Sequence, residues 1–102
     1  MQPKELITRI KSNNSPTVID VRSGSEFKSG HVPGALHAPA WKIALRIADL
    51  PKNHDAELVV TCEVGPRAQM AKVIISSMGY RNVTLLAGHM SGWRQAGLGM
   101  EK

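Results

Sequence analysis

The sequence has one cysteine, one Phe, one Tyr and two Trp among its 102 residues. A lone cysteine cannot form a disulfide within the chain, which argues against a disulfide-stapled secreted fold and fits a reducing compartment. No segment approaches the roughly 20 apolar residues that span a bilayer. Charges interrupt residues 1–14, so we expect no secretory signal there. These absences predict a cytoplasmic protein that makes no contact with a membrane.

Length and charge narrow the class further. A chain of 102 residues fits one compact domain, and we predict a single domain over residues 1–102. The formal net charge is +5, but the Lys and Arg residues are scattered and form no run. We therefore expect no nucleic-acid partner, whereas a mild positive field would help to attract a small anion.

Apolar residues follow strand-like and helix-like patterns in alternation along the chain. Runs rich in β-branched and apolar residues predict strands over 17–21, 35–38, 58–62 and 83–86. Helical spacing predicts helices from Pro3 to about residue 12 and over 25–29, 43–48, 67–78 and 88–96. Residues 58–62 are the most continuously apolar of these runs, as in a strand buried on both faces. This order favours an α/β fold with a parallel sheet.

Cys62 ends the most apolar predicted strand and opens a short loop, Glu63-Val64-Gly65-Pro66, before Arg67 begins a long helix. Ligands of α/β sheets bind beyond the carboxyl ends of the strands, and successive loop N–H groups make an anion-binding concavity. The helix terminus and Arg67 add positive potential at the same point. These surroundings favour the thiolate, which is the nucleophilic form. The alternative is an inert cysteine that only fills the core.

Three segments together resemble the rhodanese-like domain family. The first comprises Asp20-Val21-Arg22, Glu26-Phe27 and Gly30 to Ala35; the second is the loop from Cys62 to Arg67; the third is Gly88-His89 with Trp93. They occur in the expected order and cover nearly the whole chain. The resemblance implies a mostly parallel sheet of about five strands flanked by helices on both faces. It also implies a sulfurtransferase, because the Cys62-to-Arg67 segment is similar to the family's active-site loop.

The mechanism that the resemblance implies has two steps. The Cys62 thiolate takes the outer sulfur of a small anionic donor such as thiosulfate, and a thiophilic acceptor (cyanide, a thiol or a protein) then removes it. The backbone N–H groups of residues 64–68, which include Ala68, would cradle the persulfide, and Arg67 would help to hold the donor. The substrate-binding residues expected are therefore Glu63, Val64, Gly65, Pro66, Arg67 and Ala68. No cofactor or metal is needed.

Three features of the loop depart from the usual pattern. Glu63 puts a negative charge beside the nucleophile, which opposes thiolate formation and repels thiosulfate. Pro66 has no N–H, so the cradle lacks one donor. Ala68 stands where many members of the family have a hydroxyl. We therefore expect moderate thiosulfate:cyanide activity and leave a different natural donor open.

Two other functions remain open at this point. Cysteine-dependent phosphatases and arsenate reductases use a similar loop, but the dual-specificity type has five residues between Cys and Arg, whereas four separate Cys62 from Arg67. A shorter loop suits a sulfur atom better than a tetrahedral phosphate. The altered loop also leaves open a non-catalytic module that uses the same fold to bind a partner.

Other polar and aromatic residues have structural interpretations. We interpret Asp20, Arg22 and Glu26 as one structural charge cluster beside the active-site face, and His31 as a hydrogen-bonding scaffold residue. Gly88 and His89 are expected near the active-site loop. The four histidines show no ligand spacing with each other or with Cys62, so we expect no metal site. Trp41 and Trp93 are expected in packing or at a pocket rim.

Overall fold

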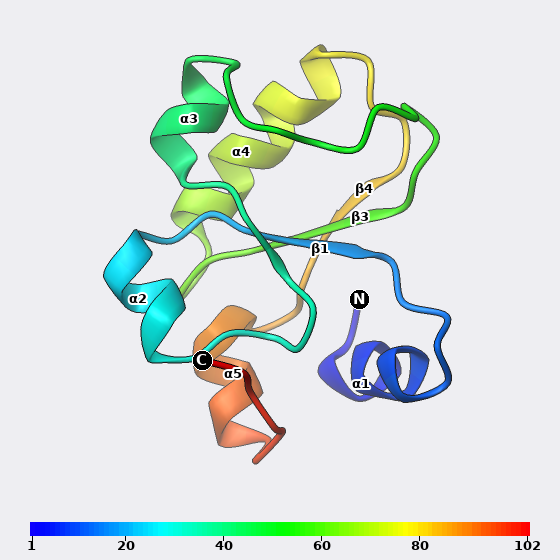
Figure 1. Ribbon diagram of the computed structural model, residues 1–102, viewed down its shortest axis with the longest axis vertical. Coiled ribbons are helices and arrows are strands. Elements are labelled where there is room, and N and C mark those ends of the chain that lie inside the picture. The colour runs from blue at the N-terminus through cyan, green and yellow to red at the C-terminus, as the bar shows by residue number, and fades with distance from the viewer.

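The computed structural model describes residues 1–102, which form five helices and four strands. The helices are α1 (Pro3–Lys11), α2 (Gly24–Ser29), α3 (Ala40–Ala44), α4 (Pro66–Ser77) and α5 (His89–Gln95). The strands are β1 (Thr17–Asp20), β2 (Leu36–His37), β3 (Leu58–Thr61) and β4 (Val83–Leu85). Figure 1 shows the alternation of strands and helices that the sequence predicts.

The sheet has four strands, not about five, and all of its pairings are parallel, in the order β2-β1-β3-β4. The expectation of a fifth strand was wrong because no other segment pairs along a strand's length. The only further bridge is a single antiparallel contact between His31 and Glu101. The long connection of residues 45–57 runs in turns and irregular backbone instead.

The direction in which successive strands are added to the sheet reverses between β1 and β3. The connection after β1 leads outward to β2, whereas β3 lies on the other side of β1 and leads to β4. At such a point the connections leave in opposite directions, which opens a crevice beyond the carboxyl ends of the two central strands. Asp20 at the end of β1 pairs with Thr61 at the end of β3. Cys62 therefore follows directly at the carboxyl end of this central pair of strands.

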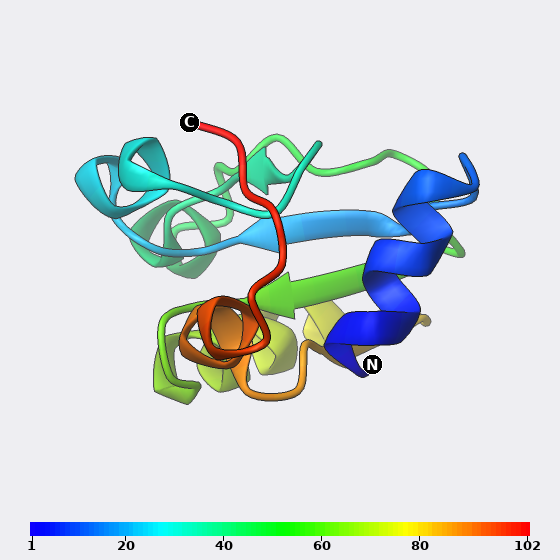
Figure 2. The same cartoon turned by 90° about the horizontal axis from the view of Figure 1, so that it is seen from below.

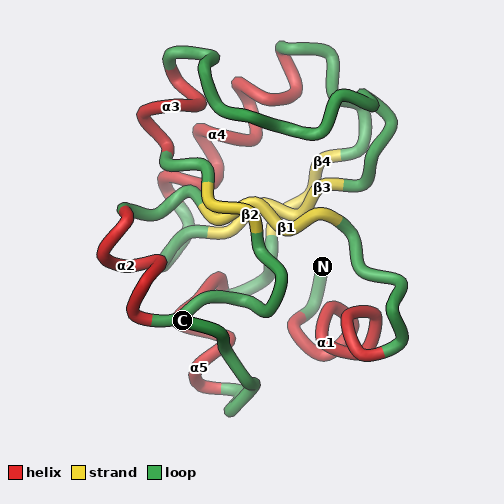
Figure 3. Tube along the Cα trace, in the orientation of Figure 1, coloured by secondary structure: helices red, strands yellow, loops and turns green.

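Helices cover both faces of the sheet. Figures 1 and 3 show α3 and α4 on one side and α1 and α5 on the other, and Figure 2 shows α1 and α5 from below. In β3, Leu58 and Val60 belong to the core under α3 and α4, whereas Val59 belongs to the core under α1 and α5. All four residues of β3 are fully buried, which confirms the predicted burial on both faces.

The helix predicted over 43–48 occupies Ala40–Ala44 instead, and Ile47 is largely exposed. Arg46 adopts a positive φ of 58° and ends the helix. Its N–H donates to the carbonyl of Ile43, and the Ile47 N–H donates to the carbonyl of Lys42. This pair of bonds is a Schellman motif with Arg in the place that glycine usually takes. The apolar spacing of residues 43–48 gave no sign of it.

None of the helices is both long enough and apolar enough to cross a membrane.

Candidate active site

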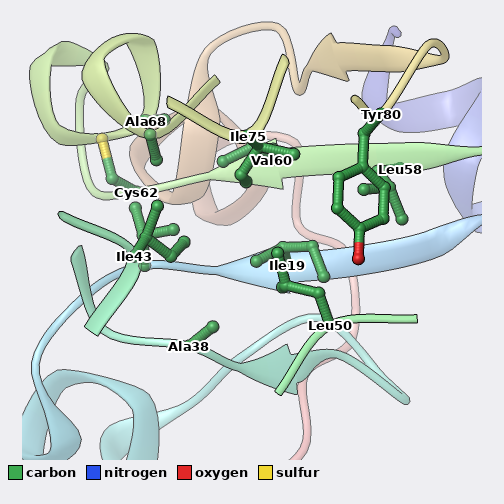
Figure 4. Packing of buried hydrophobic residues seen from close by; sticks show 12 residues of the cluster. Ile19, Ala38, Ile43, Leu50, Leu58, Val60, Cys62, Ala68, Ile75 and Tyr80 are labelled. Carbon is green, nitrogen blue, oxygen red and sulfur yellow. The ribbon is translucent and has the colours of Figure 1, made fainter. Parts of the chain in front are cut away.

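Cys62 follows β3 directly and is only 1% exposed. It belongs to the core cluster under α3 and α4, which also contains Ala68 of the first turn of α4. Figure 4 shows the two side chains as neighbours, with the Cys62 sulfur beside the ribbon of α4. The buried strand thus fixes the cysteine at the sheet end, and the helix begins four residues later.

The loop after Cys62 turns sharply and directs one backbone N–H group at the sulfur. Gly65 adopts a φ of 138°, a conformation that favours glycine, and its N–H donates to the Cys62 Sγ at 3.0 Å. The N–H groups of Val64, Arg67 and Ala68 donate to no acceptor within the protein. Pro66, the first residue of α4, has no N–H to offer. The loop therefore presents one donor to the sulfur, and four other N–H groups of residues 63–68, counting that of Glu63, have no acceptor in the protein.

The guanidinium of Arg67 is held by Glu26 of α2. Two N–H groups of Arg67 donate to the two carboxylate oxygens of Glu26 at 2.7 and 3.0 Å. The hydrogen bond from Arg67 is the largest influence on Glu26 and lowers the pKa of its carboxyl from 4.5 to about 2. The same bond is the main cause that raises the pKa of Arg67, and the nearby Cys62 adds to it.

The structure divides the predicted cluster of Asp20, Arg22 and Glu26 into two ion pairs. Arg22 and Asp20 are both fully buried, and the Arg22 Nη2 donates to Asp20 Oδ2 at 2.8 Å and to the Gly30 carbonyl at 2.7 Å. Glu26 pairs with Arg67 instead. The first pair fixes the end of β1, whereas the second joins α2 to α4.

Glu63 lies between two arginines. The Arg22 Nη1 donates to Glu63 Oε1 at 3.3 Å, and Arg94 of α5 forms an ion pair with Glu63 Oε2. The sequence pattern suggested a free negative charge beside the nucleophile. In the structure two guanidinium groups pair with that charge, so it is not the free charge that the sequence suggested.

His89 contacts the loop, as expected for the segment of Gly88 and His89. The Cys62 N–H donates to His89 Nδ1 at 3.3 Å. His31 behaves as the predicted scaffold residue, with its Nδ1 at 2.8 Å from the Phe27 carbonyl oxygen. Trp93 is fully buried in packing, whereas Trp41 is 58% exposed and packs against no core.

Sequence reasoning missed the roles of Glu26 and Arg94 at this site. Arg67 and Glu26 are 41 residues apart, and no local pattern joins them. Glu26 did carry a local signal, since Ser23 and Glu26 form a capping box at the start of α2, but that signal indicates a helix end. No cluster of His, Cys, Asp and Glu side chains is suited to hold a metal ion.

The chain belongs to the rhodanese-like domain family, whose model matches residues 2–96. A sulfurtransferase from Allochromatium vinosum is 30% identical over 95 residues, which cover 93% of this chain and 87% of that protein. The thiosulfate sulfurtransferase GlpE of Pseudomonas fluorescens is 35% identical over 79 residues, or 76% of this chain and 69% of that protein. The solved structure of the human single-domain sulfurtransferase TSTD1 superposes with a TM-score of 0.78 at 30% identity, over 93% of this chain and 94% of that chain.

Sulfurtransferases are therefore among the relatives of this chain, at about 30% sequence identity. In three other curated relatives the chain matches less than half of the protein's length: 45%, 46% and 23%. The same domain thus occurs also as a part of longer proteins.

Proposed function

We propose that the protein transfers sulfane sulfur from thiosulfate, or a similar small anionic donor, to a thiophilic acceptor through a persulfide on Cys62. The observation that carries this proposal is the hydrogen bond from the Gly65 N–H to the Cys62 Sγ, at the end of the central strand β3. An N–H donor aimed at sulfur stabilises negative charge there, and negative charge makes the sulfur nucleophilic.

The loop suits an extra sulfur atom as well as the thiolate. Once the terminal sulfur is attached, the persulfide carries its negative charge one atom further from the strand. The unpaired N–H groups of Val64, Arg67 and Ala68 lie on the same short loop and helix start. Preorganised donors of this kind stabilise an anion without the cost of reorienting water. They are the groups that we expect to hold the terminal sulfur.

The reaction balances without a cofactor. The Cys62 thiolate attacks the outer sulfur of thiosulfate, a new S–S bond forms, and the old S–S bond breaks so that sulfite leaves with the electron pair. The acceptor, for example cyanide or a thiolate, then attacks the outer sulfur of the persulfide. Thiocyanate or an acceptor persulfide leaves, and the Cys62 thiolate is restored.

Sulfur transfer agrees with the site better than phosphate-ester hydrolysis does. Phosphatase chemistry needs a proton donor for the leaving alcohol, and Glu63 is the acidic residue next to the nucleophile. Its carboxylate is held in ion pairs with Arg22 and Arg94, an arrangement that does not suit a general acid. The loop is also one residue shorter than that of the dual-specificity phosphatases.

Steady-state kinetics test the proposal. We expect thiocyanate to form from thiosulfate and cyanide with ping-pong kinetics, so that double-reciprocal plots at several cyanide concentrations are parallel. Cys62→Ser keeps the volume and removes the nucleophile, so it should fold normally, as judged by circular dichroism, and form no thiocyanate above background. Turnover by Cys62→Ser at the wild-type rate would refute the role of the cysteine.

A further inference from the structure

His89 has an unusual backbone for its residue type. It adopts a φ of 52° at the start of α5, directly after Gly88 at 73°. Residues with a Cβ are uncommon in this region, although His is among the types that are found there more often than most. Such outliers persist where other contacts hold them, and they are concentrated at functional sites. What the imidazole contacts is therefore informative.

The ring contacts both ends of the Cys62–Gly65 segment. At one end Nδ1 accepts the Cys62 N–H at 3.3 Å, and this N–H has no other acceptor in the protein. At the other end the ring edge packs on Gly65: a Cβ added to Gly65 would lie 3.4 Å from Nε2 and 3.5 Å from Cδ2 of His89. These two residues are the ones that the 3.0 Å bond from the Gly65 N–H to Sγ joins.

The contact requires a neutral imidazole. Only an unprotonated Nδ1 can accept the Cys62 N–H, so the proton of the neutral ring is on Nε2. The side chain is almost fully buried, and this burial lowers the pKa of His89 below its ordinary value of 6.5. At neutral pH the ring is therefore in the form that the contact needs.

We propose that His89 is a positioning residue for the sulfur on Cys62. It fixes the strand end at Cys62 and supports Gly65 from behind, so that the Gly65 N–H stays directed at the sulfur. This inference rests on the proposed sulfurtransferase function and adds a part to it. It also accounts for the presence of His in a backbone conformation in which glycine would be less strained.

Two substitutions separate positioning from mere packing. His89→Gly relieves the positive φ but leaves the Cys62 N–H without an acceptor. His89→Asn tolerates a positive φ, and its side-chain oxygen can accept the same N–H. If His89 only packs against its neighbours, both substitutions change the stability of the protein but leave the chemistry of Cys62 in the folded chain unchanged. Positioning predicts that Asn replaces His and glycine does not.

The test measures sulfur chemistry in two independent ways. One is the ultraviolet absorbance of the Cys62 thiolate at one mildly alkaline pH, which requires no donor. The other is the single-turnover rate of persulfide formation with thiosulfate. We expect His89→Gly to reduce the thiolate signal and to slow persulfide formation by roughly three- to tenfold, the effect of losing about one hydrogen bond. We expect His89→Asn to keep both near the wild-type values.

The outcomes are distinguishable. Wild-type signals in His89→Gly, or losses in His89→Asn as large as those in His89→Gly, would overturn the positioning role while leaving the sulfurtransferase function intact. If the wild-type protein forms no persulfide at all, the proposed function fails. The thiolate absorbance of the three proteins still decides then whether His89 orients the loop. Urea midpoints of the three proteins show that the comparison is made between folded chains.

Discussion

At the residue scale, the guanidinium that we propose attracts the donor, that of Arg67, is already paired with Glu26. It holds both carboxylate oxygens of Glu26, and the Arg67 side chain is still 41% exposed. We expect the same group to attract the anionic donor, because it stands at the end of the loop that follows Cys62. A charge already shared with a carboxylate attracts a second anion less strongly than a free one does.

We predict that Arg67→Ala raises the KM for thiosulfate by roughly tenfold or more, since a charge-assisted hydrogen bond contributes about 1.5–3 kcal/mol. Glu26→Gln removes the competing carboxylate charge and leaves the guanidinium in place. Its KM for thiosulfate should stay the same or fall. Steady-state kinetics with thiosulfate as the varied donor measure both values. An equal rise in the two variants would mean that Arg67 serves only as the partner of Glu26.

The sequence predicted some residues of the site and not others, for a physical reason. Cys62 and its loop were predictable because strand, turn and helix signals adjoin within a few residues. The sequence predicted that His89 lies near the loop, but it did not predict the hydrogen bond between them. The compensation of Glu63 by Arg22 and Arg94 was missed. It depends on side chains from β1's end and α5, which only the folded sheet brings together.

At the scale of elements, the pair of Glu26 and Arg67 joins α2 to the first turn of α4. Helix α2 has six residues and none of them is buried, so packing alone fixes it weakly. The ion pair to α4 and the stacking of Phe27 on the rings of His31 and His37 are contacts that hold it in place. The position of α2 is thus tied to that of the active-site loop.

This pair should make stability depend on acidity. The pKa of Glu26 is about 2 in the folded protein and 4.5 ordinarily, so its contribution is fully present above pH 4.5 and is lost as the pH falls toward 2. We predict that the gap in urea midpoint between wild type and Glu26→Gln, which is present at about pH 6, shrinks at about pH 3. Both proteins share the other carboxylates, whose effects cancel in the difference. A gap that stays constant over this range would contradict the assignment.

The ends of elements show where local signals suffice. Helix α4 was predicted within a residue at each end, because Gly65 precedes it, Pro66 is its first residue and Gly79 follows shortly after it. Helix α3 was placed several residues too late, since the positive φ of Arg46 depends on backbone hydrogen bonds rather than on residue type. Glycine in that position would have given a signal, and arginine gives none.

At the scale of the whole molecule, two apolar layers meet at one parallel sheet. The cluster under α3 and α4 includes Cys62, whereas the cluster under α1 and α5 includes Trp93 and Met90. The site lies at the carboxyl end of the central pair β1 and β3, where the strand order reverses. The general class of the fold was predictable from alternating patterns. The residue patterns also located all four strands, whereas the count of about five came from the family resemblance alone.

The central claim is that Cys62 carries sulfur. Its most direct test is the intact mass of the protein after incubation with thiosulfate and removal of the excess. We predict that the wild-type chain gains the mass of one sulfur atom, loses it again on addition of cyanide or a thiol, and that Cys62→Ser gains nothing. If the folded wild-type chain gains no sulfur from thiosulfate or from any other sulfane donor, the account is contradicted, and a binding role for the same fold takes its place.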